Sequence, residues 1–430
     1  MFSINAGLSI FLLFFAFLLL NFPVSIALGL AGVTVFFLFD IGPVETIPLL
    51  FTGAISSFTL LAIPLFIIAG NMLAKTGVAR RLIHFAQVLV GPLPGGLPIT
   101  VIVGGAFLGA LSGSNVAAIA ALGFLIGAMH QVGYPIAFAC VTVAAGCTFG
   151  VIIPPSINLI LYGVIANTSI AALFAAGIGP GIVLVIVLSV YIYYTSKKHD
   201  YPIPMVDRSW KNVWDAFKEA VWGLLAPVLV LGGIYGGIFT ATEAAAFMIL
   251  YVFCIDKFIY KEMAFHSYPK MLLESGITTG VIMLILGGAT IVSYILMMDG
   301  TAELINEWLV TMGHGSKIIV LAWVNVILFI SGMFLDPVSA IYLLVPLFLP
   351  AIDSVGVDKV HFGAIMTVNL SLAHITPPVG LALYLAAQIA NVPFMQAARA
   401  AIPFVICEVI VLVFITYIPS LSLGFVKLLT

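Results

Sequence analysis

The sequence predicts an all-α integral membrane protein built from two inverted repeats, each with a re-entrant helical hairpin and a broken helix. Three observations lead to this fold class. The 430 residues are 63% hydrophobic and only 7% charged, apolar runs recur along the whole chain, and a pattern of Gly and Pro residues returns after 223 positions. The first two observations exclude an ordinary water-soluble fold, and the third indicates an internal duplication.

The apolar runs set the expected number of membrane crossings. Soluble domains carry about 25% charged residues, and a bilayer core about 30 Å thick takes roughly 20 helical residues, so ten or so crossings fit this chain. Lipid cannot satisfy backbone polar groups, and continuous rather than alternating runs favour helices over a barrel. No basic residue precedes the first run, so we expect a retained helix and not a cleaved signal peptide. The clearest runs are Leu8 to Leu20, Ile26 to Phe39, Leu60 to Leu73, Gly181 to Tyr194 and Phe404 to Ile418.

Positive charge gives the expected orientation. Lys and Arg are enriched in cytoplasmic loops, and twelve of the fifteen fall into four groups that can share one side. This assignment needs an odd number of crossings before Lys75, which the three preceding runs supply, and it places the N-terminus outside. The net charge of −2 implies no nucleic-acid partner. The four groups are Lys75, Arg80 and Arg81; Lys197, Lys198, Arg208, Lys211 and Lys218; Lys257, Lys261 and Lys270; and Arg399.

The first re-entrant hairpin follows from this orientation. Arg81 and Lys197 lie on the same side, but three apolar stretches separate them, so one stretch must enter and return. The stretch 97–130 is interrupted by Leu111-Ser112-Gly113-Ser114-Asn115. We therefore expect a hairpin that enters from the cytoplasm, with these polar residues at its tip.

The later half repeats the pattern in the opposite orientation. A shift of 223 positions aligns Gly77 with Gly300 and Pro154-Pro155 with Pro377-Pro378. Gly and Pro fix backbone geometry, so their recurrence weighs more than shared hydrophobicity. Gly77 lies among basic residues, inside, whereas Gly300 lies in an acidic stretch, outside. A second hairpin at 316–352 should then enter from outside, and inverted repeats of this kind place ligand and ion sites near the bilayer midplane.

Each half combines a polar hairpin tip with a helix broken at Pro-Pro. Two prolines remove two donors and free carbonyls one turn earlier, and a desolvated Na⁺ is a suitable partner for such oxygens. The alternative is that these residues only shape helix ends and allow close packing. Asp336 at the second tip is either an ion ligand or a helix cap. The side chains that favour ion sites are Ser112, Ser114 and Asn115 beside the break at Pro154, and Asp336, Asn369 and Thr376 beside the second break.

An anionic ligand would meet no Lys or Arg at either break. Helix N-termini, hydroxyls and amides would hold it instead. His374 is the one potentially cationic side chain beside a break, although a lone His is commonly structural. We expect structural roles for two further acids: Glu408 snorkels or caps a packing contact, and Glu243 begins a helix as part of an N-cap. The predicted ligand contacts are Asn115, Ser156, His374 and Gly380.

Two amphipathic segments precede the hairpins. Residues 76–90 and 299–313 both carry charge beside apolar residues, as helices lying in the membrane interface do. Placed on opposite faces, they could link a moving hairpin domain to a fixed frame. The predicted division is 1–75 scaffold, 76–96 first arm, 97–167 first transport half, 168–298 scaffold with a cytoplasmic loop at 196–218, 299–315 second arm, 316–390 second transport half, and 391–430 C-terminal helix.

Several motifs resemble the large membrane subunit of tripartite ATP-independent periplasmic (TRAP) transporters, over essentially the whole chain. They are Gly109-Ala110-Leu111-Ser112-Gly113-Ser114, Ile153-Pro154-Pro155-Ser156-Ile157, Phe239-Thr240-Ala241-Thr242-Glu243-Ala244, Leu335-Asp336-Pro337 and Thr376-Pro377-Pro378-Val379-Gly380.

The resemblance implies an elevator mechanism with Na⁺ as the coupling ion, in the inner membrane of a bacterium. The N-terminus, which the charge pattern places outside, would then lie in the periplasm. It implies a periplasmic substrate-binding protein, a small four-helix membrane subunit on a separate chain, and a carboxylate cargo such as a C4-dicarboxylate or a sialic acid. Na⁺ would lie between hairpin tip and broken helix. The matching positions are Ser112, Asn115 and Gly150 in the first half, and Gly332, Ala373 and Thr376 in the second.

One departure and three rival functions remain at this point. Family members often carry Gly-Leu where this chain has Ala373-His374, so His374 could report a cargo preference. The rivals are a self-sufficient anion–Na⁺ symporter, a channel and an intramembrane enzyme. No His-Glu metal motif or catalytic Ser/Asp pairing stands out, so we expect a transporter and no enzyme.

Overall fold

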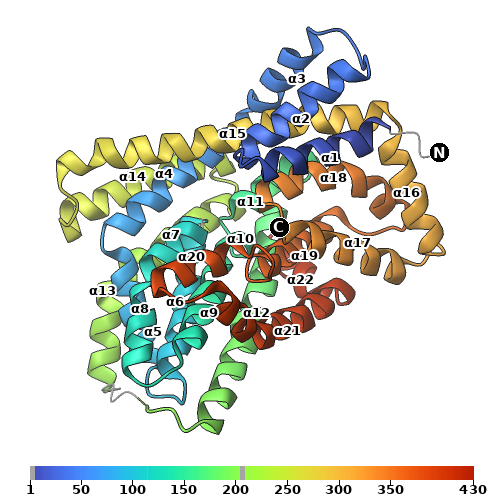
Figure 1. Ribbon diagram of the computed structural model, residues 1–430. Helices are drawn as coiled ribbons and strands as arrows, with labels where there is room; N and C mark the ends of the chain where they lie inside the picture. The colour runs from blue at the N-terminus through green and yellow to red at the C-terminus, as the bar shows by residue number, and fades with distance from the viewer. Residues whose placement is uncertain (1–4, 114, 204–208) are drawn as a thin grey trace.

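The computed structural model describes residues 5–113, 115–203 and 209–430, with the side chain of Val116 also left out. These residues form helices joined by short turns, and no strand occurs among them. Figure 1 shows a long helix, α15 (Tyr268–Met298), running across the upper part of the molecule, with α3 (Thr46–Ile55) above it and most of the other helices below. The all-helical class predicted from the sequence is confirmed.

One group of helices packs around α15. Helix α15 contacts α2 most extensively, and it also contacts α1, α3, α4 and α18. Helix α4 in turn contacts α14. The remaining members are α13 and the 3-10 turn η1 that leads into α4. The bounds are α1 Ala6–Leu19, α2 Val24–Leu38, α3 Thr46–Ile55, η1 Phe58–Leu61, α4 Ala62–Lys75, α13 Trp210–Tyr235 and α14 Ala241–Cys254.

A second group contains the predicted hairpins and broken helices. In the first half, α6 and α7–α8 form the arms of the first hairpin, and α9–α10 and α11 form the broken helix. The bounds are α5 Val78–Val90, α6 Gly96–Ser112, α7 Asn115–Leu122, α8 Phe124–Gln131, α9 Ile136–Cys147, α10 Phe149–Ile152, α11 Ile157–Ile165 and α12 Ile170–Lys198.

The second half repeats this order. Helices α17 and α18 form a helical hairpin, and α19 and α20 form a broken helix, followed by a long helix and a short C-terminal one. The bounds are α16 Thr301–Met312, α17 Lys317–Gly332, α18 Pro337–Ser354, α19 Lys359–Ala373, α20 Leu381–Ala390, α21 Phe394–Tyr417 and α22 Ser420–Leu429.

Elements of the two halves correspond at the offset found in the sequence. Helix α5 follows Gly77 and α16 follows Gly300, and both glycines have positive φ, 68° and 72°. Glycine is favoured there because it has no Cβ to clash in the left-handed region. Shifted by 223, the starts of α9 and α19 coincide, and the starts of the other paired helices agree within three residues. Both Pro-Pro bonds, 154–155 and 377–378, are cis.

Fewer helices span a membrane on their own than the ten or so crossings predicted. In the described ranges, six helices are long and apolar enough to do so, and the bent pair 136–152 and 157–165 would make a seventh. The difference has a physical reason, because the hairpin arms and half-helices other than α18 have at most 17 residues and are too short to cross alone. Helix α3, which has no buried side chain, was not predicted.

Candidate functional site

In both halves, the first arm of the hairpin packs tightly against the broken helix. A Cβ added to Gly109 would lie 2.8 Å from the backbone nitrogen of Gly150, and one added to Gly332 would lie 2.6 Å from the Cβ of Ala373. The two contacts correspond at the offset of 223. Of the residues that the resemblance assigned to the ion sites, Gly332 and Ala373 are therefore in contact, and Gly150 packs against Gly109, three residues before Ser112.

The interface between the first hairpin arm and the broken helix is called the seam here. Away from the contacts just described, the seam is packed differently in the two halves. In the first half, the seam is closed by glycine: a Cβ at Gly105 would overlap the carbonyl of Gly146, and one at Gly146 would lie 2.8 Å from the carbonyl oxygen of Val101. In the second half, the position equivalent to Gly146 is Asn369. Its Nδ2 donates to Oδ1 and to the carbonyl of Asn325, at 2.8 and 2.9 Å.

The two broken helices touch each other at equivalent residues. The hydroxyl of Ser371 on α19 donates to the carbonyl oxygen of Thr148, between α9 and α10, at 3.0 Å. These positions are 223 residues apart, and both are at least 98% buried. A contact between equivalent positions is what a two-fold relation between the halves requires.

A second contact joins the tip of the first hairpin to the second break. Asn115 Nδ2 lies 2.7 Å from His374 Nδ1. An amide nitrogen can only donate, so Nδ1 accepts and the ring proton belongs on Nε2. His374 is 6% exposed, and its Nε2 and the Oδ1 of Asn115 are buried without a hydrogen-bond partner among the described residues. Buried polar atoms are nearly always satisfied, so this pair points to a missing partner.

A cavity of about 550 Å³ adjoins this pair. Its wall includes the first turns of four helices: α7 and α18 from the two hairpins, and α11 and α20 from the two broken helices. All four helices have eight or more residues. Helix N-termini carry partial positive charge and orphan N–H groups. The residues of these turns that line the cavity are Asn115, Ala117, Pro337, Val338, Ile157, Asn158 and Leu381.

Helices α4 and α15 also line the cavity. Asn71 and Lys75 on α4, and Thr278 and Ile282 on α15, line the cavity. Asn71 Nδ2 donates to the hydroxyl of Ser275 at 2.8 Å, and Lys75 forms an ion pair with Glu274.

Sequence reasoning missed Asn71, Lys75, Asn158 and Thr278 as cavity residues. Lys75 was counted as a loop charge, although it closes the last turn of α4. The sequence could have indicated Asn71 and Asn158, because an amide side chain inside an apolar helix is unusual.

The predicted hydroxyl ligands lie at the hairpin tip and the two breaks. The hydroxyl of Ser112 donates to the carbonyl of Leu108 at 2.9 Å, and that of Thr376 to Leu372 at 2.9 Å. Ser156 donates to the carbonyl of Val151 across the first break, beside Pro154. Ser112 and His374 line the cavity, while Ser156, Thr376 and Gly380 are not part of its wall. Ser114 lies outside the described residues.

Two predicted residues of the second ion site have local partners. Asp336 is the N-cap of α18: its Oδ2 accepts from the backbone nitrogen of Ser339 at 3.2 Å, and its Oδ1 accepts from the Ser339 hydroxyl at 2.6 Å. The helix-cap alternative therefore accounts for Asp336. Asn369 faces Asn325 on α17, as described above, and Asn325 also donates to Thr416 on α21 at 3.1 Å. The ion roles of Asp336 and Asn369 stay predictions.

The other two acids behave differently from each other. Glu243 forms a capping box with Thr240: the Thr240 backbone N–H donates to Glu243 Oε2 at 2.8 Å, and the Thr240 hydroxyl accepts from the Glu243 N–H at 3.3 Å. The N–H of Thr240, and then its hydroxyl, lower the pKa of this carboxyl. The N-cap prediction is confirmed. Glu408 does not snorkel: it is 2% exposed, and its Oε1 has no hydrogen-bond partner in the described part of the chain.

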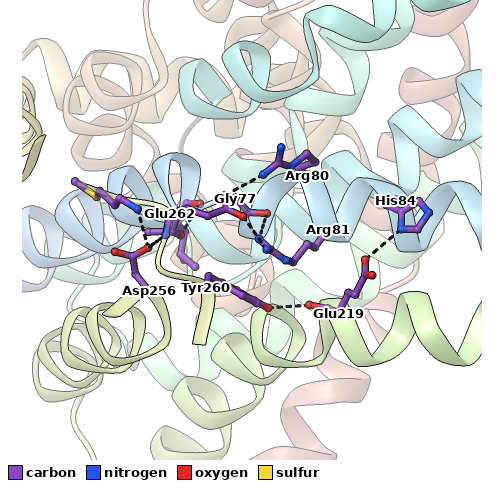
Figure 2. Close-up of polar contacts among 11 residues, drawn as sticks. Gly77, Arg80, Arg81, His84, Glu219, Asp256, Tyr260 and Glu262 are labelled. Atoms are coloured by element: carbon purple, nitrogen blue, oxygen red, sulfur yellow. Dashed lines mark hydrogen bonds and ion pairs between the residues drawn. The ribbon is translucent and has the colours of Figure 1, made fainter. Parts of the chain in front are cut away.

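The start of the first arm is tied to α13 and to the segment 255–262 that follows α14 (Figure 2). Arg80 and Arg81 converge on Glu262, at 2.9 and 2.7 Å, and the Arg81 guanidinium lies 3.8 Å from the centre of the Tyr260 ring. Tyr260 donates to the carbonyl of Glu219, whose carboxylate lies 3.6 Å from His84. Figure 2 shows these side chains grouped beside Gly77, where the arm begins.

This chain is similar in sequence to several known proteins. It is 36% identical over 440 residues to the C4-dicarboxylate TRAP transporter large permease protein DctM of Rhodobacter capsulatus, covering 99% of each chain. It is 35% identical over 373 residues to the sialic acid TRAP transporter large permease protein SiaM of Vibrio cholerae, covering 86% of this chain and 87% of that one. It is 38% identical over 413 residues to the isethionate TRAP transporter permease protein DctMQ of Oleidesulfovibrio alaskensis, covering 96% of this chain and 65% of that longer one.

The fold also has a solved counterpart. The crystal structure of the YdaH transporter of Alcanivorax borkumensis superposes with a TM-score of 0.62 at 15% sequence identity, covering 95% of this chain and 97% of the other. At this identity the likeness concerns the fold alone. The profile described as "Tripartite ATP-independent periplasmic transporter, DctM component" matches residues 11–421. The chain therefore belongs to the DctM family of TRAP transporter large permeases, which are multi-pass membrane transporters and not enzymes.

Proposed function

We propose that this protein carries a small organic anion across the bacterial inner membrane, coupled to Na⁺, by an elevator movement. The observation that carries this proposal is the cavity whose wall holds the N-terminal turns of four helices, two from hairpins and two from broken helices. Broken-helix transporters hold anionic groups at such N-termini. The cargo is a carboxylate of the C4-dicarboxylate or sialic acid kind, or a similar small acid.

The anion is held mainly by backbone N–H groups and amide side chains. Four N-terminal turns supply orphan N–H donors, and Asn115 and His374 add the side chains that join the two halves. With its Nδ1 accepting from Asn115, His374 offers an Nε2–H as a neutral donor. Ser156 and Gly380 contribute indirectly, because they are the N-cap residues of α11 and α20 and shape the two breaks at which these helices begin.

Na⁺ occupies the complementary helix ends. Helix α6 ends at Ser112 and α10 at Ile152, and in the second half α17 ends at Gly332 and α19 at Ala373. Helix C-termini carry partial negative charge and free carbonyls, which suit a coupling cation. The first ion lies near Ser112, Ser114, Asn115, Gly150 and Pro154, and the second near Gly332, Asp336, Asn369, Ala373 and Thr376.

The elevator part of the proposal rests on the repeats. The helix bounds correspond at one offset, and equivalent residues of the two broken helices touch. Both observations support two inverted halves that pack as one moving body. The helices around α15 form the frame, and α5 and α16 are the arms between frame and moving body. The division of the chain at 75, 96, 167, 298, 315 and 390 is part of this proposal.

The partners follow from the family. A periplasmic binding protein delivers the cargo, and a small four-helix subunit on its own chain joins the frame, with the N-terminus in the periplasm. The relative named DctMQ supports a separate small subunit, because the match to this chain covers only 65% of that longer protein.

Uptake into proteoliposomes tests the proposal. The protein is reconstituted with its small subunit, and the binding protein is added outside with labelled succinate, N-acetylneuraminate or isethionate. We expect accumulation above equilibrium of at least one probe with an inward Na⁺ gradient, and none with K⁺. Equal uptake without the binding protein would favour the self-sufficient symporter, and equilibration without accumulation would favour a channel.

A further inference from the structure

Lys75 is the one Lys, Arg, Asp or Glu among the described residues that line the cavity. It lies in the last turn of α4, which lines the cavity together with the four N-terminal turns. Its ammonium group pairs with Glu274 on α15, and Glu274 is not part of the cavity wall. An anion in the cavity therefore meets a single full positive charge, and that charge already has a partner from outside the cavity.

The pair is arranged for exchange. The Lys75 and Glu274 side chains are 38% and 44% exposed, and pairs this exposed are weak because water and salt compete for both groups. Asn71, one turn before Lys75 on α4, and the fully buried Ser275, next to Glu274 on α15, hold the two helices together by a hydrogen bond of 2.8 Å. The helices thus remain joined when the Lys75–Glu274 pair opens, so breaking the ion pair does not require moving the frame.

We propose that Lys75 is an anion-binding residue at the mouth of the cavity, where an anionic group of the cargo replaces Glu274 as its partner. This inference rests on the proposed transport function and adds a binding station to it. Lys75 belongs to the group of basic residues assigned to the cytoplasmic side. The station therefore lies on the release path, and Glu274 displaces the cargo when the pair forms again.

The inference predicts a specific pattern of substitutions. Lys75→Gln removes the charge and should weaken cargo binding about tenfold, the scale of one hydrogen bond to a charged group. Lys75→Arg keeps the charge and should bind nearly as the wild type does. Glu274→Gln removes the competitor and should tighten binding. Lys257→Gln is the matched control. It removes an exposed positive charge that the charge pattern assigns to the same side of the membrane as Lys75, and Lys257 does not line the cavity.

The experiment measures equilibrium binding to the complex of the full chain with its small subunit, in detergent and Na⁺, without the binding protein. Isothermal titration uses whichever of succinate, N-acetylneuraminate and isethionate the wild type transports. Opposite changes in dissociation constant for Lys75→Gln and Glu274→Gln, shrinking as ionic strength rises, would support the station. Equal binding by Lys75→Gln, Lys257→Gln and the wild type would overturn it and leave the transport proposal standing.

Two further outcomes complete the test. Equal losses in Lys75→Gln and Lys75→Arg, together with a lower melting temperature for both, would mean that Lys75 only supports the helix pair, which overturns the inference. A wild type that neither transports nor binds any probe overturns this inference together with the proposed function.

Discussion

The replacement Gly109→Ala tests the link between hairpin packing and ion binding most directly. The new Cβ would lie 2.8 Å from the backbone nitrogen of Gly150 and 3.0 Å from the carbonyl oxygen of Phe149. Carbon contacts are comfortable at about 3.5 Å or more, so the hairpin must withdraw by roughly 0.5–0.7 Å. Both opposing atoms are backbone, and no side chain can rotate away to relieve the overlap.

The size of the effect follows from the same contact. Overpacking of this kind costs about 1–3 kcal/mol. The strain is relieved by separating the hairpin tip from the break, and Na⁺ binding between them requires the opposite movement. The cost should therefore appear as a weaker Na⁺ affinity, by about 5- to 150-fold.

Two assays with one matched control measure it. The first is the Na⁺ concentration that half-saturates uptake in proteoliposomes, and the second is the rise in melting temperature with added Na⁺, which reports binding to the folded state. Gly127→Ala is the control, because the same hairpin has open space around Gly127. If Gly109→Ala and Gly127→Ala share the same Na⁺ half-saturation, the packing argument is refuted.

Four further outcomes are expected. Ser112→Ala and Thr376→Ala should each raise the Na⁺ concentration for half-maximal uptake without changing expression, and unchanged Na⁺ dependence in both would reject the two assignments. Glu262→Gln frees the two arginines of the arm from their shared partner and should lower the maximal uptake rate at unchanged cargo affinity, at a stability cost of only about 0.2–1 kcal/mol per pair; a changed affinity would contradict an anchoring role. Asn325→Ala removes the acceptor amide of the second seam and should lower the free energy of unfolding by about 0.6–2 kcal/mol, measured by thermal denaturation in detergent. Thr240→Ala breaks a capping box and should cost about 1 kcal/mol at neutral pH; because the partner carboxyl has a lowered pKa in the folded state, the difference should shrink as pH falls through that pKa.

The parts of the fold that the sequence predicts correctly depend on local backbone geometry. Pro154-Pro155 and Pro377-Pro378 mark the two breaks, and Gly77 and Gly300 mark the starts of the two arms, because each requires a particular backbone conformation wherever it occurs. The hairpin at 97–130 was predicted by counting charges. In the structure, α6 ends at Ser112 and α7 begins at Asn115, which is the predicted tip.

What the sequence did not reveal depends on tertiary register. The contact of the Asn369 amide nitrogen with Asn325 was not predicted, because only the pairing of α17 with α19 decides it, and the ion role of Asn369 stays a prediction. Lys75 was read as a loop charge, whereas its direction into the cavity depends on how α4 packs beside α15. Helix α3 was missed because it is only ten residues long and follows a stretch that reads as a loop.

The two seams between hairpin and broken helix have a consequence for engineering the chain. In the first half the backbones meet directly at Gly105 and Gly146, and in the second an asparagine pair stands at that depth. An asparagine placed at Gly146 in the first half would have its Cβ 2.8 Å from the carbonyl oxygen of Val101 and no room for an amide. The residues of one seam therefore cannot be moved singly into the other, although the helix boundaries of the two halves still match. Each half has been refitted to its own neighbours, and the symmetry survives in the backbone more than in the side chains.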